Sequence, residues 1–292
     1  MIKITENFWG KLDAKRFKIS TIWLILTAYS KASLIHKIDM ISIKTSLKHL
    51  IKKFLNKKGY TIIPVDDYII KLENVRYNWL KKIKPGIIID VGASNGGFAR
   101  KIRNVLPEAQ LYCFEPLIQS YRSLVDSFSN DKNFIAYNFA ISNFTGVSDF
   151  YECVSNGSSS ILEMTDVHKK AYPNTSENRK ISIQVDTLDN VLFEKLKAKN
   201  DIVLLKIDVQ GAEALVLKGA EKTLELIDII FTEINFSETY KDCVKINEMI
   251  RILESSGFVL SGIENVSQSL IDGSFLQADA FFVKTHIEKL FF

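Results

Sequence analysis

The sequence predicts an α/β fold, in which a mostly parallel sheet is covered by helices on both faces. From residue 87 onward, short apolar runs alternate with longer segments of helical periodicity, as parallel strands and crossover helices require. The first run, 87–89, leads into a glycine-rich turn and a helical segment, which together are typical of a nucleotide-type cofactor site. With 292 residues, the chain can hold one large α/β domain and an extension.

The predicted elements follow in a regular order, with one interruption. We expect strands at 87–91, 110–114, 134–140, 202–208 and 228–234, and helices at 96–105, 117–128, 212–226 and 243–256. Two late segments, 258–264 and 278–284, are expected to form a terminal hairpin of strands. The stretch 143–186 breaks the alternation, with strands expected at 148–154 and 181–185. Because insertions of that length are usually functional, we expect a substrate wall or lid there.

The first part of the chain differs from the rest in charge. Residues 1–86 contain 18 Lys/Arg and 6 Asp/Glu, a net charge of +12, whereas the remainder contains 20 and 28, a net charge of −8. Apolar residues at helical spacing between the lysines of 44–55 predict an amphipathic helix. We therefore expect a helical, lysine-rich extension over 1–60 ahead of a domain at 61–292, with a lead-in helix at 68–82.

The basic extension allows two interpretations. The favoured one is a set of amphipathic helices with solvated lysine faces, and the other is a weak contact with a membrane surface or between subunits. No nucleic-acid partner is expected. The three cysteines are far apart, which favours a reducing cytoplasm over a disulfide framework or a zinc site. The start lacks a signal-peptide pattern, and the uncharged run 19–30 is shorter than the about 20 residues that span a bilayer.

Acids at the ends of two neighbouring predicted strands indicate the cofactor. Asp90 closes the first strand, where a dinucleotide would place its pyrophosphate and a carboxylate would repel it. A carboxylate suits the cationic arm of S-adenosylmethionine instead. Glu115 ends the second strand, where an acid can accept hydrogen bonds from both ribose hydroxyls. The candidate cofactor-binding residues are Asp90, Gly92, Ala93, Asn95, Gly96, Glu115, Asn138 and Ala140.

Two of these candidates come from the third predicted strand. Asn138 either hydrogen-bonds an adenine edge or caps the end of its strand, and Ala140 leaves room for the ring. The sequence does not decide between the two roles of Asn138.

The fourth predicted strand carries charged residues inside an apolar run. Lys206 and Asp208 share one face of 202–208, where charges are costly unless they are paired or used. They form either a functional pair or an internal ion pair. Glu233 ends the next strand, so the catalytic candidates are Asp208, Lys206 and Glu233. Asp208 is the first choice for taking a proton from the acceptor, with Lys206 setting its charge state.

Two further residues leave alternatives open. Asn235 could join Asp208 and Glu233 in presenting three oxygen ligands to a Mg²⁺-like ion, but the favoured reading is that Glu233 binds substrate or backbone and that no metal is held. His168 is interpreted as a surface residue rather than a base.

The reaction type follows partly from motifs that the sequence lacks. Transfer to an exocyclic amine of a base tends to use an Asn/Asp-Pro-Pro-aromatic turn, and transfer to a pyrimidine carbon needs a cysteine beside a proline. Neither occurs in the 292 residues, so a hydroxyl acceptor remains. We expect methyl transfer by in-line displacement, to which alignment contributes up to roughly 7–11 kcal/mol.

Eight segments together resemble the FkbM-type methyltransferase family, a branch of the S-adenosylmethionine-dependent Rossmann-like enzymes. They are Asp-Val-Gly-Ala-Ser-Asn-Gly-Gly-Phe at 90–98, Tyr-Cys-Phe-Glu-Pro at 112–116, Asn-Phe-Ala-Ile-Ser at 138–142, Gly-Ser-Ser-Ser at 157–160, Val-Asp-Thr-Leu-Asp at 185–189, Lys-Ile-Asp-Val-Gln-Gly-Ala-Glu at 206–213, Leu-Lys-Gly-Ala at 217–220 and Asp-Ala-Phe-Phe-Val-Lys at 279–284. Their order and spacing match too. The asparagine and glycine of the first turn stand one residue later than is usual in the family.

The resemblance implies a Rossmann-like class I methyltransferase fold with a seven-stranded sheet. It also implies O-methylation, often of sugar or polyketide hydroxyls, and a cofactor held by 90–97 and Glu115. Lys206, Asp208 and Glu213 carry over as residues that line the site. Residues 1–60 lie outside the resemblance.

The leading interpretation is an O-methyltransferase that acts on a hydroxyl of a glycan, a sugar or a secondary metabolite. A nicotinamide dehydrogenase is a second reading, which Asp90 disfavours. The third is a non-catalytic scaffold that keeps the fold and binds a membrane or a partner through its basic arm. The intact set of acids stands against it.

Overall fold

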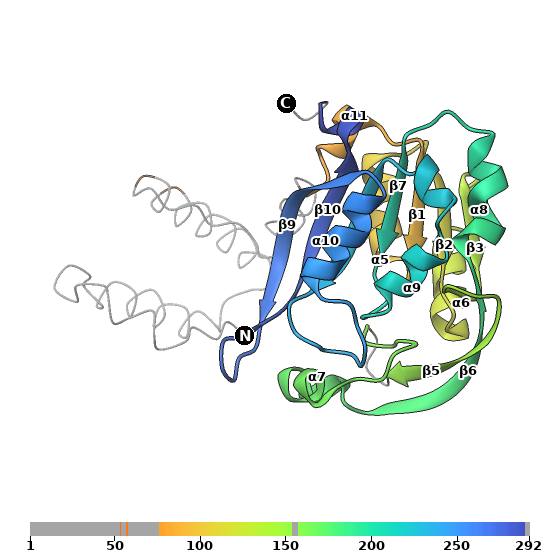
Figure 1. Cartoon of the computed structure of the whole chain (residues 1–292). Coiled ribbons are helices and arrows are strands. Elements are labelled where there is room, and N and C mark those ends of the chain that lie inside the picture. Colours follow the sequence, from red (N-terminus) through yellow and green to blue (C-terminus); the bar gives the residue numbers. More distant parts are fainter. Residues whose placement is uncertain (1–52, 54–56, 58–75, 154–156, 290–292) are drawn as a thin grey trace, which may run out of the picture. The chain divides into compact units, whose positions relative to one another are not determined.

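The computed structural model describes residues 76–153 and 157–289, together with Lys53 and Lys57. The chain divides into two units, Met1–Tyr68 and Ile69–Phe292, and every element below belongs to the second (Figure 1). The predicted extension over 1–60, the boundary after it and the start of the lead-in helix lie outside the described residues and stay predictions. In the part of the chain that is described, no helix has the length and apolar character needed to cross a membrane.

A seven-stranded sheet forms the centre of the second unit. Its order is β3-β2-β1-β7-β8-β10-β9. Five strands run parallel: β1 (Ile87–Val91), β2 (Gln110–Phe114), β3 (Phe134–Tyr137), β7 (Val203–Ile207) and β8 (Ile229–Asn235). The last two, β9 (Phe258–Gln268) and β10 (Phe275–Lys284), form the predicted antiparallel hairpin at one edge. This arrangement confirms the predicted Rossmann-like class I methyltransferase fold.

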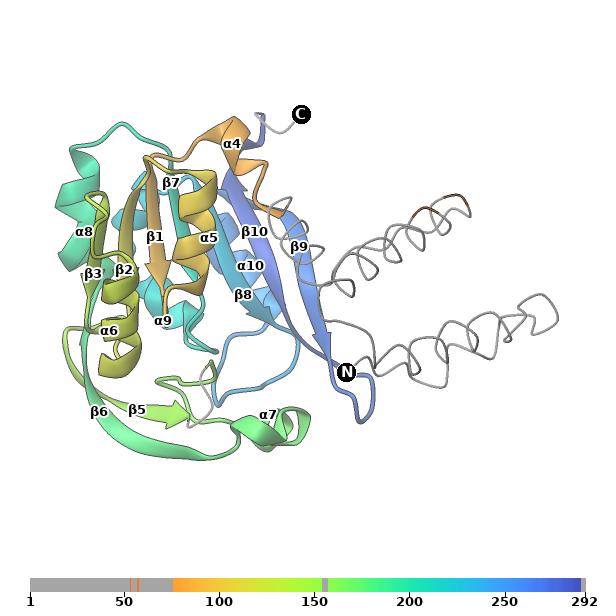
Figure 2. The ribbon, with the colours of Figure 1, turned by 180° about the vertical axis from the view of Figure 1, so that it is seen from behind.

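Helices cover both faces of this sheet, as predicted. The face toward the viewer in Figure 1 packs against α8 (Leu188–Lys197), α9 (Glu213–Lys218) and α10 (Ile246–Ser255). The opposite face, seen in Figure 2, packs against α4 (Leu80–Ile83), α5 (Gly97–Val105), α6 (Ile118–Ser127) and α11 (Thr285–Glu288).

The central strand β1 shows how the sheet divides its side chains between these two layers. Ile87, Ile89 and Val91 join the core on the α8–α10 side, and Ile88 joins the core on the α5–α6 side. The alternation follows from the two-residue period of a strand. Asp90 therefore points to the same face as Ile88, beneath α5.

The predicted strand 134–140 was wrong in its extent. β3 ends at Tyr137, and β4 (Ala140–Ile141) belongs to a second sheet. Asn138 separates the two, because its side-chain amide donates hydrogen bonds to the carbonyls of Glu115 (2.9 Å) and Pro116 (3.0 Å) and holds the chain at the end of β2.

Two helices also differ from the prediction. The helix expected over 212–226 breaks after Lys218 and resumes as a short 3₁₀ turn at Thr223–Leu226. The break coincides with Gly219, whose backbone packs so closely on Ser142 that a Cβ would lie 2.0 Å from its carbonyl oxygen. The helix α8 was not predicted; Thr187 caps its start by accepting a hydrogen bond from the amide of Asn190 (3.1 Å).

The insertion at 143–186 forms a small subdomain at the carboxyl ends of the parallel strands (Figures 1 and 2). Its three-stranded sheet has the order β4-β6-β5, with β5 (Gly146–Cys153) antiparallel to β6 (Asn178–Asp186). These strands confirm those expected at 148–154 and 181–185, with shifted ends. Between them lie α7 (Asp166–Ala171) and a 3₁₀ turn at Pro173–Thr175.

Candidate active site

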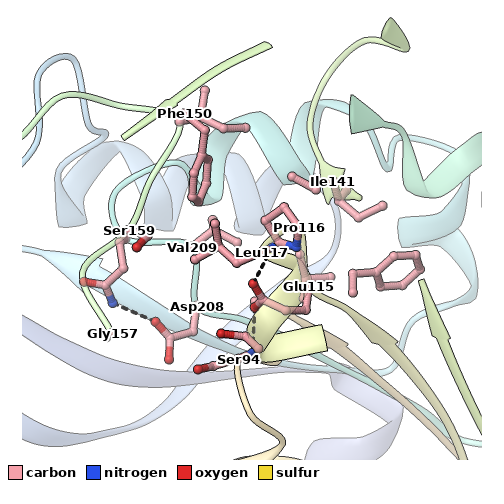
Figure 3. A pocket seen from close by; sticks show the side chains of 17 residues that line it. Ser94, Glu115, Pro116, Leu117, Ile141, Phe150, Gly157, Ser159, Asp208 and Val209 are labelled. Carbon is pink, nitrogen blue, oxygen red and sulfur yellow. Dashed lines mark hydrogen bonds between the residues drawn. The ribbon is translucent and has the colours of Figure 1, made fainter. Parts of the chain in front are cut away.

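Three clefts lie at the carboxyl ends of the parallel strands, and each is named here after one residue that lines it. The Glu115 cleft has a cavity volume of about 110 Å³ and is partly open to solvent (Figure 3). Its lining consists of Val91, Gly92, Ser94, Phe114, Glu115, Pro116, Leu117, Ser120, Ala140, Ile141, Phe150, Gly157, Ser159, Ile161, Asp208, Val209 and Gln210.

The other two clefts share walls with it. The Lys206 cleft, on the α5 side, shares Gly92, Ser94 and Asp208 with the Glu115 cleft. The His168 cleft, between the insertion and the β9–β10 hairpin, shares Gly157 and Gln210 with it. Glu233 and Asp279 line both the Lys206 and the His168 clefts. The three clefts therefore meet around the loop that follows β7.

The glycine turn brings this loop and β1 into direct contact. Gly92 has a φ of +81°, and a Cβ on it would lie 1.9 Å from the backbone oxygen of Asp208, so only glycine fits. The amides of Gly92 and Ala93 both donate to the carbonyl of Phe114, at 3.1 and 3.0 Å. Gly96, with a φ of +86°, then forms the N-cap of α5. The turn thus fixes the end of β1 between β2 and the β7 loop.

Glu115 is held at the end of β2 by backbone donors on both sides. Its side chain is buried, with the residue 5 % exposed. One carboxylate oxygen accepts a hydrogen bond from the amide of Ser94 and the other from that of Leu117, both at 2.8 Å (Figure 3). Burial raises the pKa of Glu115 to about 7, although the two backbone bonds oppose the rise. Each oxygen keeps a lone pair that can accept a further hydrogen bond, from a hydroxyl of a ligand in the cleft.

Asp90 lies beneath the clefts and lines none of the three. It pairs in register with Lys206 across β1 and β7, and the Nζ of Lys206 lies 3.2 Å from its Oδ1. Burial raises the pKa of Asp90, and the lysine opposes that rise. The expected direct contact of Asp90 with a cationic ligand is therefore not supported by this geometry, because Lys206 already neutralises the carboxylate.

Lys206 bridges this buried acid to the cleft surface. Its Nζ also lies 3.4 Å from Oδ2 of Asp208, so the two predicted residues are brought together. Burial opposes the positive charge of Lys206, but the two carboxylates outweigh it and raise its pKa, so that it stays an ammonium. Asp208 is 44 % exposed at its side chain, and its Oδ1 accepts a hydrogen bond from Nε2 of Gln210 (2.8 Å). Asp208 is thus an accessible carboxylate beside a fixed cation.

Glu233 lies apart from Asp208, on the wall between the Lys206 and His168 clefts. Its Oε2 accepts a hydrogen bond from Nε2 of Gln277 (2.6 Å), while Oε1 is buried without a partner among the described residues. Burial raises the pKa of Glu233 well above its ordinary value, and the nearby carboxylates of Glu213, Asp208 and Asp279 raise it further. The carboxyl of Glu233 therefore holds its proton more tightly than an ordinary glutamate.

Asn235 and Glu213 have internal roles. Asn235 is fully buried, accepts a hydrogen bond from Thr239 (2.9 Å) and lines none of the three clefts, so the three-oxygen ligand set with Asp208 and Glu233 is not assembled. Over residues 76–153 and 157–289, no group of three or more His, Cys, Asp or Glu side chains could hold a metal ion. Glu213 accepts hydrogen bonds from the amides of Val209 and Gly211 at 3.2 and 3.1 Å and so shapes the β7 loop.

The remaining candidates divide between the clefts and the backbone. Ala140 lines the Glu115 cleft, and Ala93 and Asn95 line the Lys206 cleft. Asn138 lines none of the three clefts. Its side-chain amide donates to backbone carbonyls, in agreement with the alternative that Asn138 caps the end of its strand. The expectation that His168 is a surface residue was wrong. It is 2 % exposed, and burial lowers its pKa to about 4.

Several lining residues were not singled out from the sequence. Ser94 stands inside the glycine motif and could have been identified there, since its amide fixes Glu115. Phe150 and Ile161 come from the insertion, where no sequence pattern indicates which side chains face the cleft. Arg76 was also missed; it lines the Lys206 cleft and pairs with Asp279 (3.1 Å) and Glu264.

Comparison with known proteins gives matches in both sequence and structure. One similar protein is the 2-O-methyltransferase NoeI of Sinorhizobium fredii (strain NBRC 101917 / NGR234), 27 % identical over 192 residues that cover 64 % of this chain and 78 % of NoeI. Two similar solved structures are magnesium protoporphyrin IX methyltransferase of Synechocystis PCC 6803 (10 % identity, 82 % and 97 % coverage, TM-score 0.38) and Aeropyrum pernix fibrillarin (14 %, 70 % and 73 %, 0.36), both with bound S-adenosylmethionine.

A family model also matches more than half of the chain. It describes the methyltransferase FkbM domain and matches residues 90–260, which run from the end of β1 into β9. This segment contains Glu115, Lys206, Asp208 and Glu233. The chain therefore belongs to the FkbM family of methyltransferases.

Proposed function

We propose that this enzyme transfers a methyl group from S-adenosylmethionine to a hydroxyl of a glycan, a sugar or another small-molecule acceptor. An oxygen acceptor is supported by the similarity to a 2-O-methyltransferase and by the accessible carboxylate of Asp208. Family membership removes the dehydrogenase alternative.

The Glu115 cleft fits the nucleoside part of the cofactor. Glu115 offers two carboxylate oxygens, each with a free lone pair, to the two hydroxyls of a ribose. Apolar side chains of Leu117, Ile141 and Phe150 line the same cleft and suit a flat purine ring (Figure 3). Ala140 leaves space beside them.

The Lys206 cleft, which shares Gly92 and Ser94 with the Glu115 cleft, is the adjoining space for the amino-acid arm. Asn95 lines it at the start of α5, where the unpaired amides of a helix N-terminus favour a carboxylate. The cofactor, when bound, supplies a methyl group activated by a sulfonium. Asp90 contributes by holding Lys206 in place.

Asp208 is the residue that would act on the acceptor. It lies where the Glu115 and Lys206 clefts meet, and its Oδ2 would take the proton of the acceptor hydroxyl as the oxygen forms its bond to carbon. The ammonium of Lys206 lies 3.4 Å from this Oδ2, and Gln210 orients the carboxylate through Oδ1. Alignment of the hydroxyl by the surrounding walls supplies the remaining assistance.

The observation that carries this proposal is that Glu115, a buried carboxylate with two free lone pairs, and Asp208, an accessible carboxylate, line one cleft. Calorimetry with S-adenosylmethionine and with NAD tests the first part, and we expect binding of the former alone. Methyl transfer from labelled cofactor to glycan and metabolite extracts tests the second. Tight cofactor binding without any transfer would favour the non-catalytic scaffold.

A further inference from the structure

The His168 cleft has a lining of unusual polarity. Hydroxyls, amides and carboxyls from the insertion and from the β9–β10 hairpin face it, among them those of Ser158, Tyr172, Thr175, Ser267, Gln277 and Asp279. The wall that it shares with the Glu115 cleft includes Gln210, which hydrogen-bonds Asp208. A ligand in this cleft would therefore lie next to the proposed proton acceptor.

Three buried polar atoms of this lining have no hydrogen-bond partner among the described residues. They are Nδ1 of His168, Oε1 of Glu233 and Oε1 of Gln277. The other polar atom of each side chain is engaged: His168 Nε2 with Thr175 (3.0 Å), and Gln277 Nε2 with Glu233 Oε2 (2.6 Å). A buried polar atom without a partner is destabilising, so a ligand that hydrogen-bonds these atoms is favoured.

The charge of the lining restricts that ligand. Among its described residues there is no lysine or arginine, while Glu233 and Asp279 are carboxylic. Asp279 is compensated by Arg76 (3.1 Å) and by Asn265 (2.6 Å). Burial lowers the pKa of His168 to about 4, so this imidazole is uncharged at pH 7, and burial raises the pKa of Glu233 well above its ordinary value. The cleft can thus offer hydrogen bonds to hydroxyls, but no cation to a phosphate or a carboxylate.

We propose that the His168 cleft is the acceptor subsite, that it takes the uncharged, polyhydroxylated ring of a sugar, and that Glu233 is its specificity-determining residue. With Gln277, Glu233 presents hydrogen-bonding groups to adjacent hydroxyls, and the described lining holds no lysine or arginine that would favour an anionic ring. Glu233 is therefore a binding group rather than a second base. This inference rests on the proposed function, since it places the ring beside Asp208.

The test uses the full-length protein saturated with S-adenosylhomocysteine and a panel of methyl glycosides of neutral hexoses and 6-deoxyhexoses. The matching uronates and 6-phosphates form the charged half of the panel. Saturation-transfer NMR titrations give a Kd for each probe. We expect saturable binding of neutral probes and at least tenfold weaker binding of the charged ones. Failure of every neutral probe to bind, or equal binding of the charged ones, would overturn the proposal.

Variants of Glu233 test its role in the same assay. Glu233→Gln keeps the size of the side chain and can both donate and accept hydrogen bonds, so we expect the Kd to stay within about threefold of the wild type. Glu233→Ala should weaken binding about tenfold or more, since Gln277 also loses its partner. Glu254→Gln and Glu254→Ala, at an exposed position on α10, are the matched controls. Equal Kd values for Glu233→Ala and the wild type would overturn the assignment.

Turnover separates the binding role from catalysis. Once an acceptor is found in the extract screen, Glu233→Ala should raise its KM about tenfold and lower kcat by far less than the hundredfold or more that loss of a base would cause. Cofactor affinity and thermal unfolding of each variant show that the fold and the Glu115 cleft are intact. If methyl transfer occurs but no neutral sugar binds, the subsite assignment fails and the proposed function stands. If the cofactor does not bind, both fail.

Discussion

Glu115 follows β2 and Glu233 lies near the end of β8; both are buried, at 5 % and 6 % exposed, yet their surroundings shift their pKa values differently. Glu115 accepts two backbone hydrogen bonds, and burial raises its pKa to about 7. Glu233 accepts one hydrogen bond from a side-chain amide and faces other carboxylates, so its pKa rises well above its ordinary value. The difference shows that hydrogen-bond donors and neighbouring carboxylates, and not exposure alone, set the pKa of a buried acid.

This contrast assigns different tasks to the two regions. The Glu115 cleft offers a diol an acid whose pKa is about 7, and the Glu233 side offers an acceptor an acid whose pKa is raised well above its ordinary value. Asp208 lies between them, with its Oδ2 3.4 Å from Nζ of Lys206. The following predictions alter one region while leaving the other as a reference.

The largest effect is expected from Asp208→Asn. The amide cannot accept the hydroxyl proton, so kcat should fall about 10²–10⁴-fold. The Glu115 cleft keeps its other walls, so calorimetry should find the Kd for S-adenosylmethionine nearly unchanged. Asp126→Asn, an exposed site on α6, is the matched control. Retained turnover in Asp208→Asn would exclude it as the proton acceptor.

The next largest effect concerns the turn that joins the regions. Gly92→Ala should lower the free energy of unfolding by more than about 3 kcal/mol, because strain at a φ of +81° adds to the overlap with the backbone of Asp208. Gly257→Ala is the matched control, with a similar φ of +83° but no atom within 4 Å of the added Cβ. It should cost only about 1–2 kcal/mol. If urea denaturation shows equal losses of unfolding free energy for the two variants, the close approach to Asp208 does not contribute to the cost.

Glu115→Ala should weaken S-adenosylmethionine binding by about 1–3 kcal/mol, through loss of charge-assisted hydrogen bonds to the ribose. Glu233→Ala, at the other region, should leave this Kd unchanged. Calorimetry on both variants makes the comparison. A loss of affinity in Glu233→Ala that matches Glu115→Ala would mean that the two regions do not divide the tasks.

The smallest effect is the pH dependence of nucleoside binding. Burial raises the pKa of Glu115 to about 7, so the carboxylate is mostly ionised at pH 8 and mostly protonated at pH 6. The Kd for 5′-methylthioadenosine, which lacks the amino-acid arm, should therefore rise about tenfold from pH 8 to pH 6. Fluorescence or calorimetric titrations measure it, and Glu115→Gln should show a flat profile. An equally flat profile for the wild type would show that the ionised carboxylate of Glu115 does not bind the nucleoside.

The sequence predicts the parts of this molecule whose signals are local. Strand β1, its glycine turn and the end of β2 at Glu115 depend on neighbouring residues, and all were predicted within one residue. The split of β3 from β4 depends on Asn138 reaching the carbonyl of Glu115, which no local pattern shows. The burial of His168 likewise arises from Tyr172 and Tyr240, which pack against its ring.

The candidate site follows the same rule. The pairing of Lys206 with Asp208 was anticipated from the two-residue period of a strand, because that period is local. The position of Asp90 was not, since its partner Lys206 lies on a strand more than a hundred residues away, and only the register of β1 with β7 places them together. The walls contributed by the insertion depend on tertiary packing.

The division of tasks between Glu115 and Glu233 can be measured directly by carboxyl ¹³C NMR titration of glutamate-labelled protein, with Glu115→Gln and Glu233→Gln used to assign the two resonances. We predict that Glu115 titrates near pH 7 in the free protein and at lower pH with S-adenosylhomocysteine, because ribose hydroxyls favour the ionised form. Glu233 should titrate well above the ordinary pKa of a glutamate in both states. A titration midpoint of Glu115 that the nucleoside does not move would contradict the account.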